Sequence, residues 1–117
     1  MIQQLEPAIK HVLRNHPRSL VVRLESRGNP DYQQDHKAYI SPPLTRPCDT
    51  FAEAVEYCRN YIGTYNLGGG NWTGGQIYHP TKGMIAKVSY NGRVWKTTNG
   101  EWQPGQEEIT ELESNNY

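Results

Sequence analysis

A glycine-rich run near the middle of the chain holds the residues best suited to contact a ligand. Residues 68–75 read Gly-Gly-Gly-Asn-Trp-Thr-Gly-Gly, which places five glycines in eight positions. Glycine lets backbone amides approach a ligand closely, and an indole ring can stack on a base or a sugar. We therefore take Gly70, Asn71 and Trp72 as candidate ligand-binding residues. The alternative is a flexible loop between a helix and a sheet.

A second group of candidates is cationic and lies on the strands that follow this run. Asn91-Gly92 predicts a two-residue hairpin turn, and that register places Lys87 opposite Lys96. Like charges on directly opposite residues cost up to about 1 kcal/mol. This face is therefore a candidate for binding phosphate, with solvent exposure beside Glu101 as the alternative.

The ends of the same turn complete the candidate list. Arg93 follows the turn, and its guanidinium can clamp a phosphate or stack on a base. A cation–π contact with Tyr90 is the alternative for this side chain. The amide of Asn91 can donate and accept hydrogen bonds, so it is suited to the polar edge of a base.

The sequence offers little for catalysis or for metal binding. The four histidines are scattered over the chain, at His11, His16, His36 and His79. There is no His-x-x-x-His pair, no Cys-x-x-Cys pair and no Walker phosphate loop, and the serines lack a nucleophile elbow. The glycine run does not match a dinucleotide-binding fingerprint either, because it follows a predicted helix rather than a strand. We therefore expect no catalytic residues, no metal and no cofactor, and a protein that is not an enzyme.

The N-terminal part of the chain predicts one helix and one strand. Pro7 suits the first turn of a helix that ends before Pro17. Residues 19–25 form a β-branched run that predicts a strand, and a weaker strand is predicted around residues 36–40. Residues 41–47 contain three prolines, which predicts a stiff connector.

The strongest helix signal covers residues 50–62. Thr50 and Glu53 form a capping box, in which each side chain satisfies an otherwise unpaired backbone amide. Apolar residues then recur on one face, at Phe51, Val55, Cys58 and Ile62. Gly63 stands where a left-handed cap would end the helix. We expect this helix to lie across a sheet.

Three strands are predicted after the glycine run, over residues 73–79, 84–90 and 93–98. The predicted register places Val88 opposite Trp95. The face expected to meet the helix then carries Met84, Ala86, Val88, Tyr90, Arg93 and Trp95.

These elements predict an α+β fold in a single small domain over residues 1–105. An antiparallel sheet, with its C-terminal meander over residues 73–98, is packed by the helix at 50–62, and an N-terminal helix and strand are added. Residues 106–117 form a separate acidic tail with Glu107, Glu108, Glu111 and Glu113, which is a short helix or disordered.

The composition indicates recognition and assembly. Only 35% of the 117 residues are hydrophobic, against about 45–50% in typical domains. The aromatic residues are mostly the amphipathic kind, with 8 Tyr and 3 Trp but 1 Phe. A small core with many tyrosines predicts that other copies of the chain cover part of the surface, so we expect a homo-oligomer.

The charge distribution fits a small anionic ligand. The formal net charge is +0, but residues 1–105 hold 12 basic and 8 acidic side chains, a net charge of +4. This excess is too small for a dedicated nucleic-acid binder. The sequence has neither an apolar run of about 18 residues nor signal-peptide features, which predicts no membrane partner. Cys48 and Cys58 are too few for a disulfide framework, so we expect a cytoplasmic location.

The hairpin sequence Val-Ser-Tyr-Asn-Gly-Arg-Val-Trp, from Val88, resembles that of small chitin- and cellulose-binding modules. A later Pro104-Gly105 adds to this resemblance, which covers fewer than about twenty residues. The Gly-Asp pair expected before Val88 is absent, as is a paired tryptophan. A shared hairpin type explains the likeness adequately.

A wider resemblance links residues 66–75 and 88–95 to another family. A helix leading into Asn-Leu-Gly-Gly-Gly-Asn-Trp-Thr-Gly-Gly, followed by the same hairpin, is similar to the sponge-type anti-defence proteins that phages use against Thoeris immunity. The resemblance implies a small, oligomeric protein that sequesters a cyclic ADP-ribose-type signal without turning it over. It assigns Asn71, Trp72, Asn91 and Arg93 to the ligand pocket, and it leaves the N-terminal third without a counterpart.

The leading hypothesis is therefore a cytoplasmic phage protein that binds and sequesters a cyclic nucleotide signal. The first alternative is a small protein-interaction inhibitor, similar in role to an anti-CRISPR protein, whose tyrosines and acidic tail contact a protein target. The second alternative is a carbohydrate-binding module.

Overall fold

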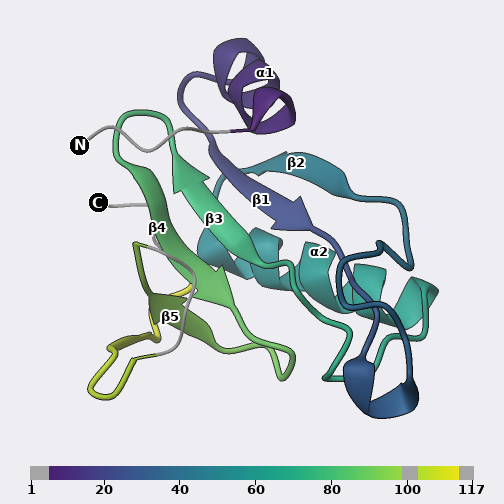
Figure 1. Cartoon of the computed structure of the whole chain (residues 1–117). Helices are drawn as coiled ribbons and strands as arrows, with labels where there is room; N and C mark the ends of the chain where they lie inside the picture. Colours follow the sequence, from purple (N-terminus) through teal and green to yellow (C-terminus); the bar gives the residue numbers. More distant parts are fainter. Residues whose placement is uncertain (1–5, 99–102, 114–117) are drawn as a thin grey trace.

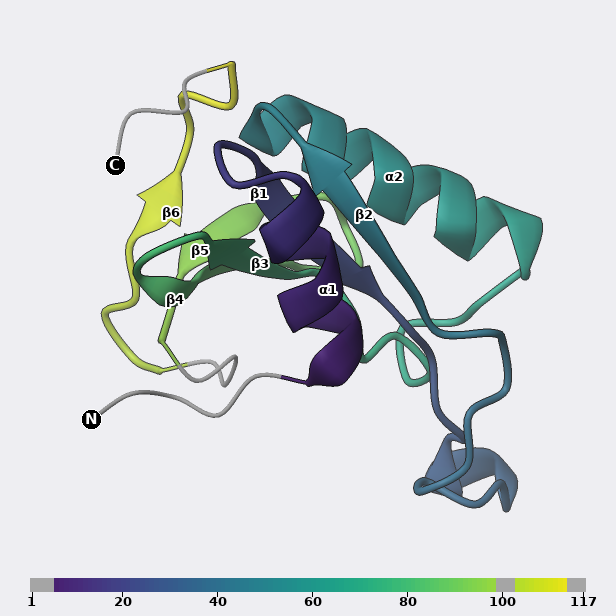
Figure 2. The ribbon, with the colours of Figure 1, turned by 90° about the horizontal axis from the view of Figure 1, so that it is seen from above.

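The structure is a computed structural model that describes residues 6–98 and 103–113. Glu101 and the last four residues of the acidic tail lie outside these ranges. Within them, six strands form one sheet in the order β2-β1-β3-β4-β5-β6, and every neighbouring pair is antiparallel (Figure 1, with β6 labelled in Figure 2). The strands are β1 (Leu20–Leu24), β2 (Leu44–Cys48), β3 (Gln76–His79), β4 (Gly83–Val88), β5 (Val94–Lys96) and β6 (Glu108–Ile109).

Two helices cover opposite faces of this sheet, α1 (Pro7–Asn15) and α2 (Phe51–Thr64) (Figure 2). Alternate residues of β1 therefore enter different cores: Val22 packs with α2, whereas Val21 packs with Ile9 of α1. All five residues of β1 are buried as a result. The predicted α+β fold with an antiparallel sheet, a packed helix and an N-terminal helix and strand is confirmed.

The amphipathic helix begins where its capping residues predict. The Thr50 hydroxyl accepts a hydrogen bond from the Glu53 backbone amide at 3.2 Å. The helix ends later than expected, at Thr64, so the prediction that Gly63 is a left-handed cap was wrong. The left-handed residue is Asn66, with φ of 51°. An asparagine tolerates this conformation because its short polar side chain can hydrogen-bond locally.

The predicted connector over residues 41–47 was wrong for its second half, because residues 44–47 belong to strand β2, whereas residues 41–43 do connect to it. β2 pairs with β1 from Leu20↔Cys48 to Leu24↔Leu44. A proline is tolerated here because β2 is an edge strand, and an edge residue can lack a ladder donor. The weak strand predicted at residues 36–40 is only an isolated bridge between Arg27 and Tyr39.

The β4–β5 hairpin has a different register from the predicted one. Its loop is three residues long and ends in Gly92, whose φ is 86°, and the Ser89 amide donates to the Arg93 carbonyl across the loop. This loop shifts every pair by one residue, so Lys87 lies opposite Trp95 and not opposite Lys96. A three-residue loop with a left-handed glycine is a common alternative to the two-residue Asn-Gly turn.

The register changes which side chains meet α2. Ala86, Val88 and Val94 are fully buried in the core beneath the helix. A β-bulge at Ile77/Tyr78 places Met84 in the α1 core instead. The predicted apolar face was therefore wrong for Met84, Tyr90, Arg93 and Trp95.

The segment assigned to a separate acidic tail continues the sheet. β6 pairs with β5 through Val94↔Ile109 and Trp95↔Glu108. The Ala52 amide at the start of α2 donates to the Leu112 carbonyl at 2.8 Å. The described part of this segment therefore contains a short edge strand, Glu108–Ile109, and not the helix or the disorder expected for it.

Candidate ligand-binding cavity

A cavity of about 240 Å³ lies beside the β4–β5 hairpin, next to the glycine-rich run. It is lined by Gly69, Trp72, Lys87, Ser89, Tyr90, Trp95 and Gln106. Three of these side chains are aromatic and one is a cation. The cavity brings together two of the seven predicted site residues, Trp72 and Lys87. In the following we call it the aromatic cavity.

The walls of the aromatic cavity are held by hydrogen bonds to the backbone. The Trp72 indole N–H donates to the Val88 carbonyl at 3.0 Å, and the ring is only 8% exposed. The Tyr90 hydroxyl donates to the Leu67 carbonyl at 3.0 Å, which ties the hairpin loop to the start of the glycine run. Trp72 is therefore a fixed wall that also belongs to the core, rather than a freely exposed stacking platform.

Trp95 enters the cavity because of the hairpin register. It is half-buried and lies directly opposite Lys87, on the face of the sheet that α2 does not cover. The predicted register instead placed this indole on the face of the sheet that packs against α2. The signal that could have placed it correctly is Gly92, because glycine also suits a three-residue loop.

Lys87 differs electrostatically from the other cations of the candidate list. Burial lowers the pKa of this side chain, and the charge of Glu25 partly opposes the effect. Within the described ranges its ammonium has neither a hydrogen bond nor an ion pair. Lys96, in contrast, is exposed and pairs with Glu107 at 3.0 Å, outside the aromatic cavity.

The polar members of the glycine run have structural roles. The Asn71 amide donates to the Arg27 carbonyl and to Gln34 Oε1, each at 3.0 Å. A Cβ at Gly70 would lie 2.0 Å from the Asn29 side chain, so any larger residue there would force that side chain to move. These two residues fasten the loop that precedes β3, and they do not line the cavity.

The two candidates at the hairpin turn are exposed and also lie outside the cavity. The Asn91 side chain accepts a hydrogen bond from the Ser89 hydroxyl. Arg93 is exposed one residue beyond Gly92. Neither side chain is brought next to Lys87 by the loop, so the predicted cluster of Asn91, Arg93, Lys87 and Lys96 is dispersed.

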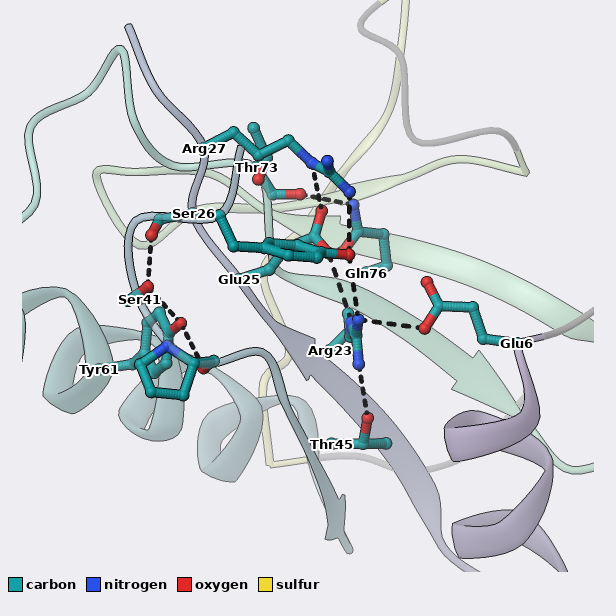
Figure 3. A network of polar contacts seen from close by, with 12 residues as sticks. Glu6, Arg23, Glu25, Ser26, Arg27, Ser41, Thr45, Tyr61, Thr73 and Gln76 are labelled. Carbon is teal, nitrogen blue, oxygen red and sulfur yellow. Dashed lines mark hydrogen bonds and ion pairs between the residues drawn. The ribbon is translucent and has the colours of Figure 1, made fainter. Parts of the chain in front are cut away.

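A buried ionic network, which the sequence did not indicate, lies further along the same sheet face (Figure 3). Arg23 is 7% exposed and contacts Glu6 at 3.1 Å, Glu25 at 3.4 Å and the Thr45 hydroxyl at 3.2 Å. It joins β1 to the residue before α1 and to β2. A buried guanidinium with several acceptors is satisfied, so this network holds the fold together and leaves no free cation for a ligand.

Two polar atoms near this network are buried without a hydrogen-bond partner in the described structure, Thr73 Oγ1 and Gln76 Oε1 (Figure 3). Gln76 lies directly opposite Lys87 on β3. Buried acceptors of this kind usually bind an ordered water molecule.

A larger cavity of about 860 Å³ has a different chemistry. Its apolar wall includes Phe51, Ile85 and Ile109. Two lysines line it and both are exposed: Lys96, which is paired with Glu107, and Lys82. The cavity is bounded by residues on both sides of positions 99–102, which the structure does not describe. The aromatic cavity is the better candidate because it combines a half-buried cation with three aromatic rings, and its lining lies away from the positions that the structure leaves undescribed.

In the described residues, no group of three or more His, Cys, Asp or Glu side chains could hold a metal ion. None of the described helices is long and apolar enough to cross a membrane. Comparison with protein-family models, curated proteins and solved structures finds no match to this chain.

Proposed function

We propose that this chain binds a small anionic ligand with a flat ring, of the cyclic ADP-ribose type, in the aromatic cavity and does not turn it over. The observation that carries the proposal is the position of Lys87, a half-buried cation between aromatic walls that has no ion pair with any described residue. Trp95 offers its indole to a base, while Lys87 offers its ammonium to a phosphate. The glycine at position 69 leaves room for close approach.

The energetics favour an anion over a neutral ligand. The half-buried Lys87 ammonium has no hydrogen bond or ion pair among the described residues, and the charge of Glu25 offsets only part of its lost hydration. A bound phosphate would compensate for the lost hydration of the ammonium, because a hydrogen bond to a charged group contributes about 1.5–3 kcal/mol. The indole and phenol rings would add stacking, which does not depend on the identity of the base.

The small size of the cavity supports the assembly of this chain into a homo-oligomer. Pockets for small ligands usually have about 300–1,000 Å³, and this one has about 240 Å³. It has room for a base or for a ribose with its phosphate, but not for a whole dinucleotide. We therefore propose that a second copy of the chain covers the remainder of the ligand.

The biological role that fits such binding is sequestration. The resemblance to sponge-type Thoeris anti-defence proteins supports a phage protein that removes a signal from the cytoplasm of its host. Of the residues that the resemblance assigns, Trp72 alone lines the aromatic cavity. We therefore base the proposal on the cavity and not on Asn71, Asn91 or Arg93.

Calorimetry with cyclic ADP-ribose, ADP-ribose and AMP tests the binding. We expect Lys87→Met to weaken binding by about 1.5–3 kcal/mol through the lost charged hydrogen bond. Arg93→Ala is the matched control, because it removes an exposed cation outside the cavity, and it should leave the affinity unchanged. Equal losses in both variants would contradict the assignment of the site.

Native mass spectrometry of the complex tests sequestration and assembly together. We expect an oligomer that retains the nucleotide, and the ligand should be recovered intact after denaturation. Recovery of a hydrolysed product would contradict binding without turnover. Retention of chito-oligosaccharides but of no nucleotide would favour a carbohydrate-binding module instead.

A protein-interaction inhibitor is the second candidate function, supported by the loop between β1 and β2. This loop projects from the body of the domain (Figure 2), and Tyr32 in it is 77% exposed. Tyrosine side chains are enriched at protein interfaces. If this role is correct, the chain will co-purify with a macromolecule and Tyr32→Ala will release it, while no nucleotide will bind.

A further inference from the structure

Lys87 is the lysine that burial sets apart in this chain. The sequence contains five lysines, and Lys10, Lys37, Lys82 and Lys96 are all exposed. Lys87 is half-buried, and it lines the aromatic cavity together with Trp72 and Trp95. The remaining four lysines therefore provide an internal reference for its reactivity.

The surroundings of Lys87 favour the neutral amine more than water does. Burial disfavours the charged form of a lysine, and it lowers the pKa of Lys87. The neighbouring cavity residues on β5 and in the C-terminal loop, Trp95 and Gln106, carry no charge, nor does Gln76 opposite on β3. Glu25 beyond the end of β1 acts in the other direction, because its negative charge stabilises the ammonium.

A lysine of this kind is a nucleophile towards carbonyl compounds. The neutral amine carries the lone pair that reacts, and placing a lysine in an apolar pocket is one way in which proteins activate it. No hydrogen bond or ion pair within the described ranges holds the Lys87 nitrogen away from a ligand. The aromatic walls would stack a flat ring beside that nitrogen.

We propose that Lys87 captures a small aromatic aldehyde or ketone as a reversible imine in the aromatic cavity. The nitrogen lone pair forms a bond to the carbonyl carbon, and the π electrons of the C=O bond move to oxygen. A proton passes from nitrogen to oxygen, and loss of one water molecule leaves a C=N bond. No oxidation or reduction occurs, and addition of water reverses the step.

This chemistry uses the same cavity as the proposed function, but it does not require nucleotide binding. The two ligands would compete, because each fills the same small cavity. The cavity of about 240 Å³ has room for a single ring with a few substituents. The ligand class is therefore a small ring-bearing carbonyl compound, with or without an acidic group.

Reductive trapping on the intact chain tests the proposal. The protein is incubated with pyridoxal at neutral pH, sodium cyanoborohydride reduces any imine, and peptide mass spectrometry locates the adduct. We expect Lys87 to be labelled several-fold faster than each of the four exposed lysines. Lys96→Arg should label normally at Lys87, whereas Lys87→Arg should lose this fast adduct while keeping the thermal midpoint of the unmodified chain.

The outcomes separate this proposal from the proposed function. Equal labelling of all five lysines, or slower labelling of Lys87, overturns imine capture whatever the nucleotide assays show. Fast labelling of Lys87 supports capture even if no nucleotide binds. If Lys87→Arg still binds nucleotide but forms no adduct, a positive charge is sufficient for nucleotide binding, whereas imine formation requires the lysine amine.

Discussion

At the scale of single residues, Trp72 and Trp95 have the same side chain but different roles, one in stability and the other in binding. Both line the aromatic cavity. Trp72 is buried, lies 6.1 Å from the Tyr61 ring between ring centroids, and donates to a backbone carbonyl. Trp95 is half-buried and lies beside Lys87. Trp72 therefore contributes to folding, whereas Trp95 is available to a ligand.

Replacing each tryptophan by phenylalanine tests this division. We expect Trp72→Phe to lower the free energy of unfolding by about 1–3 kcal/mol, because the Val88 carbonyl loses its donor inside the core. Trp95→Phe should change it by less than about 1 kcal/mol. Urea denaturation of both variants measures the two effects. A larger loss for Trp95→Phe would show that the two roles are reversed.

At the scale of secondary-structure elements, Gly63 and Gly75 differ in whether the fold has room for a side chain. Gly63 lies within α2, and a Cβ added there would meet nothing within 4 Å. Gly75 precedes β3 with φ of 92°, and a Cβ there would lie 2.2 Å from the Val88 carbonyl oxygen. The helix tolerates a side chain at its glycine, while the entry to β3 does not.

Alanine at each position gives opposite predicted changes in stability. Gly63→Ala should raise the free energy of unfolding by about 0.5–1 kcal/mol, because the unfolded chain loses conformational freedom. Gly75→Ala should lower it by more than about 1–2 kcal/mol, since a left-handed backbone is costly for alanine and a clash is added. Thermal unfolding followed by circular dichroism distinguishes the two signs. A stabilising Gly75→Ala would contradict the geometry of this entry.

At the scale of the whole molecule, the C-terminal segment completes the domain. Ile109 and Leu112 are partly buried against the core beneath α2. The Leu112 carbonyl also accepts the Ala52 amide in the first turn of α2, an amide that has no partner within a helix. The segment therefore joins β5 to the start of the main helix, which makes it part of the folding unit.

A leucine-to-alanine change in this segment measures its contribution. Leu112→Ala should lower the free energy of unfolding by about 1–2 kcal/mol, since a half-buried leucine gives part of the benefit of full burial. Glu111→Ala removes an exposed neighbour and should change it by no more than about 0.5 kcal/mol. Chemical denaturation of the pair is sufficient, and equal effects would indicate that the segment is dispensable.

Local signals in the sequence determined most of the elements. Three of these signals are the capping residue Thr50, the apolar stripe of α2 and the β-branched run of β1. Each depends only on neighbours within a few residues, so it can be recognised without knowledge of the tertiary structure. Asn91-Gly92 determined that a hairpin forms there. The same dipeptide suits loops of two and three residues, so it did not determine the register.

Only the tertiary structure decided the register and the site. Val94 rather than Trp95 fills the space beneath α2, and this choice turns Trp95 towards Lys87. The pairing of the proline-rich strand with β1, and the burial of Arg23 among its acceptors, likewise depend on residues distant in the sequence. Long-range packing decides between locally equivalent conformations, because the free energy of burying a side chain depends on what surrounds it and not on its neighbours in the chain.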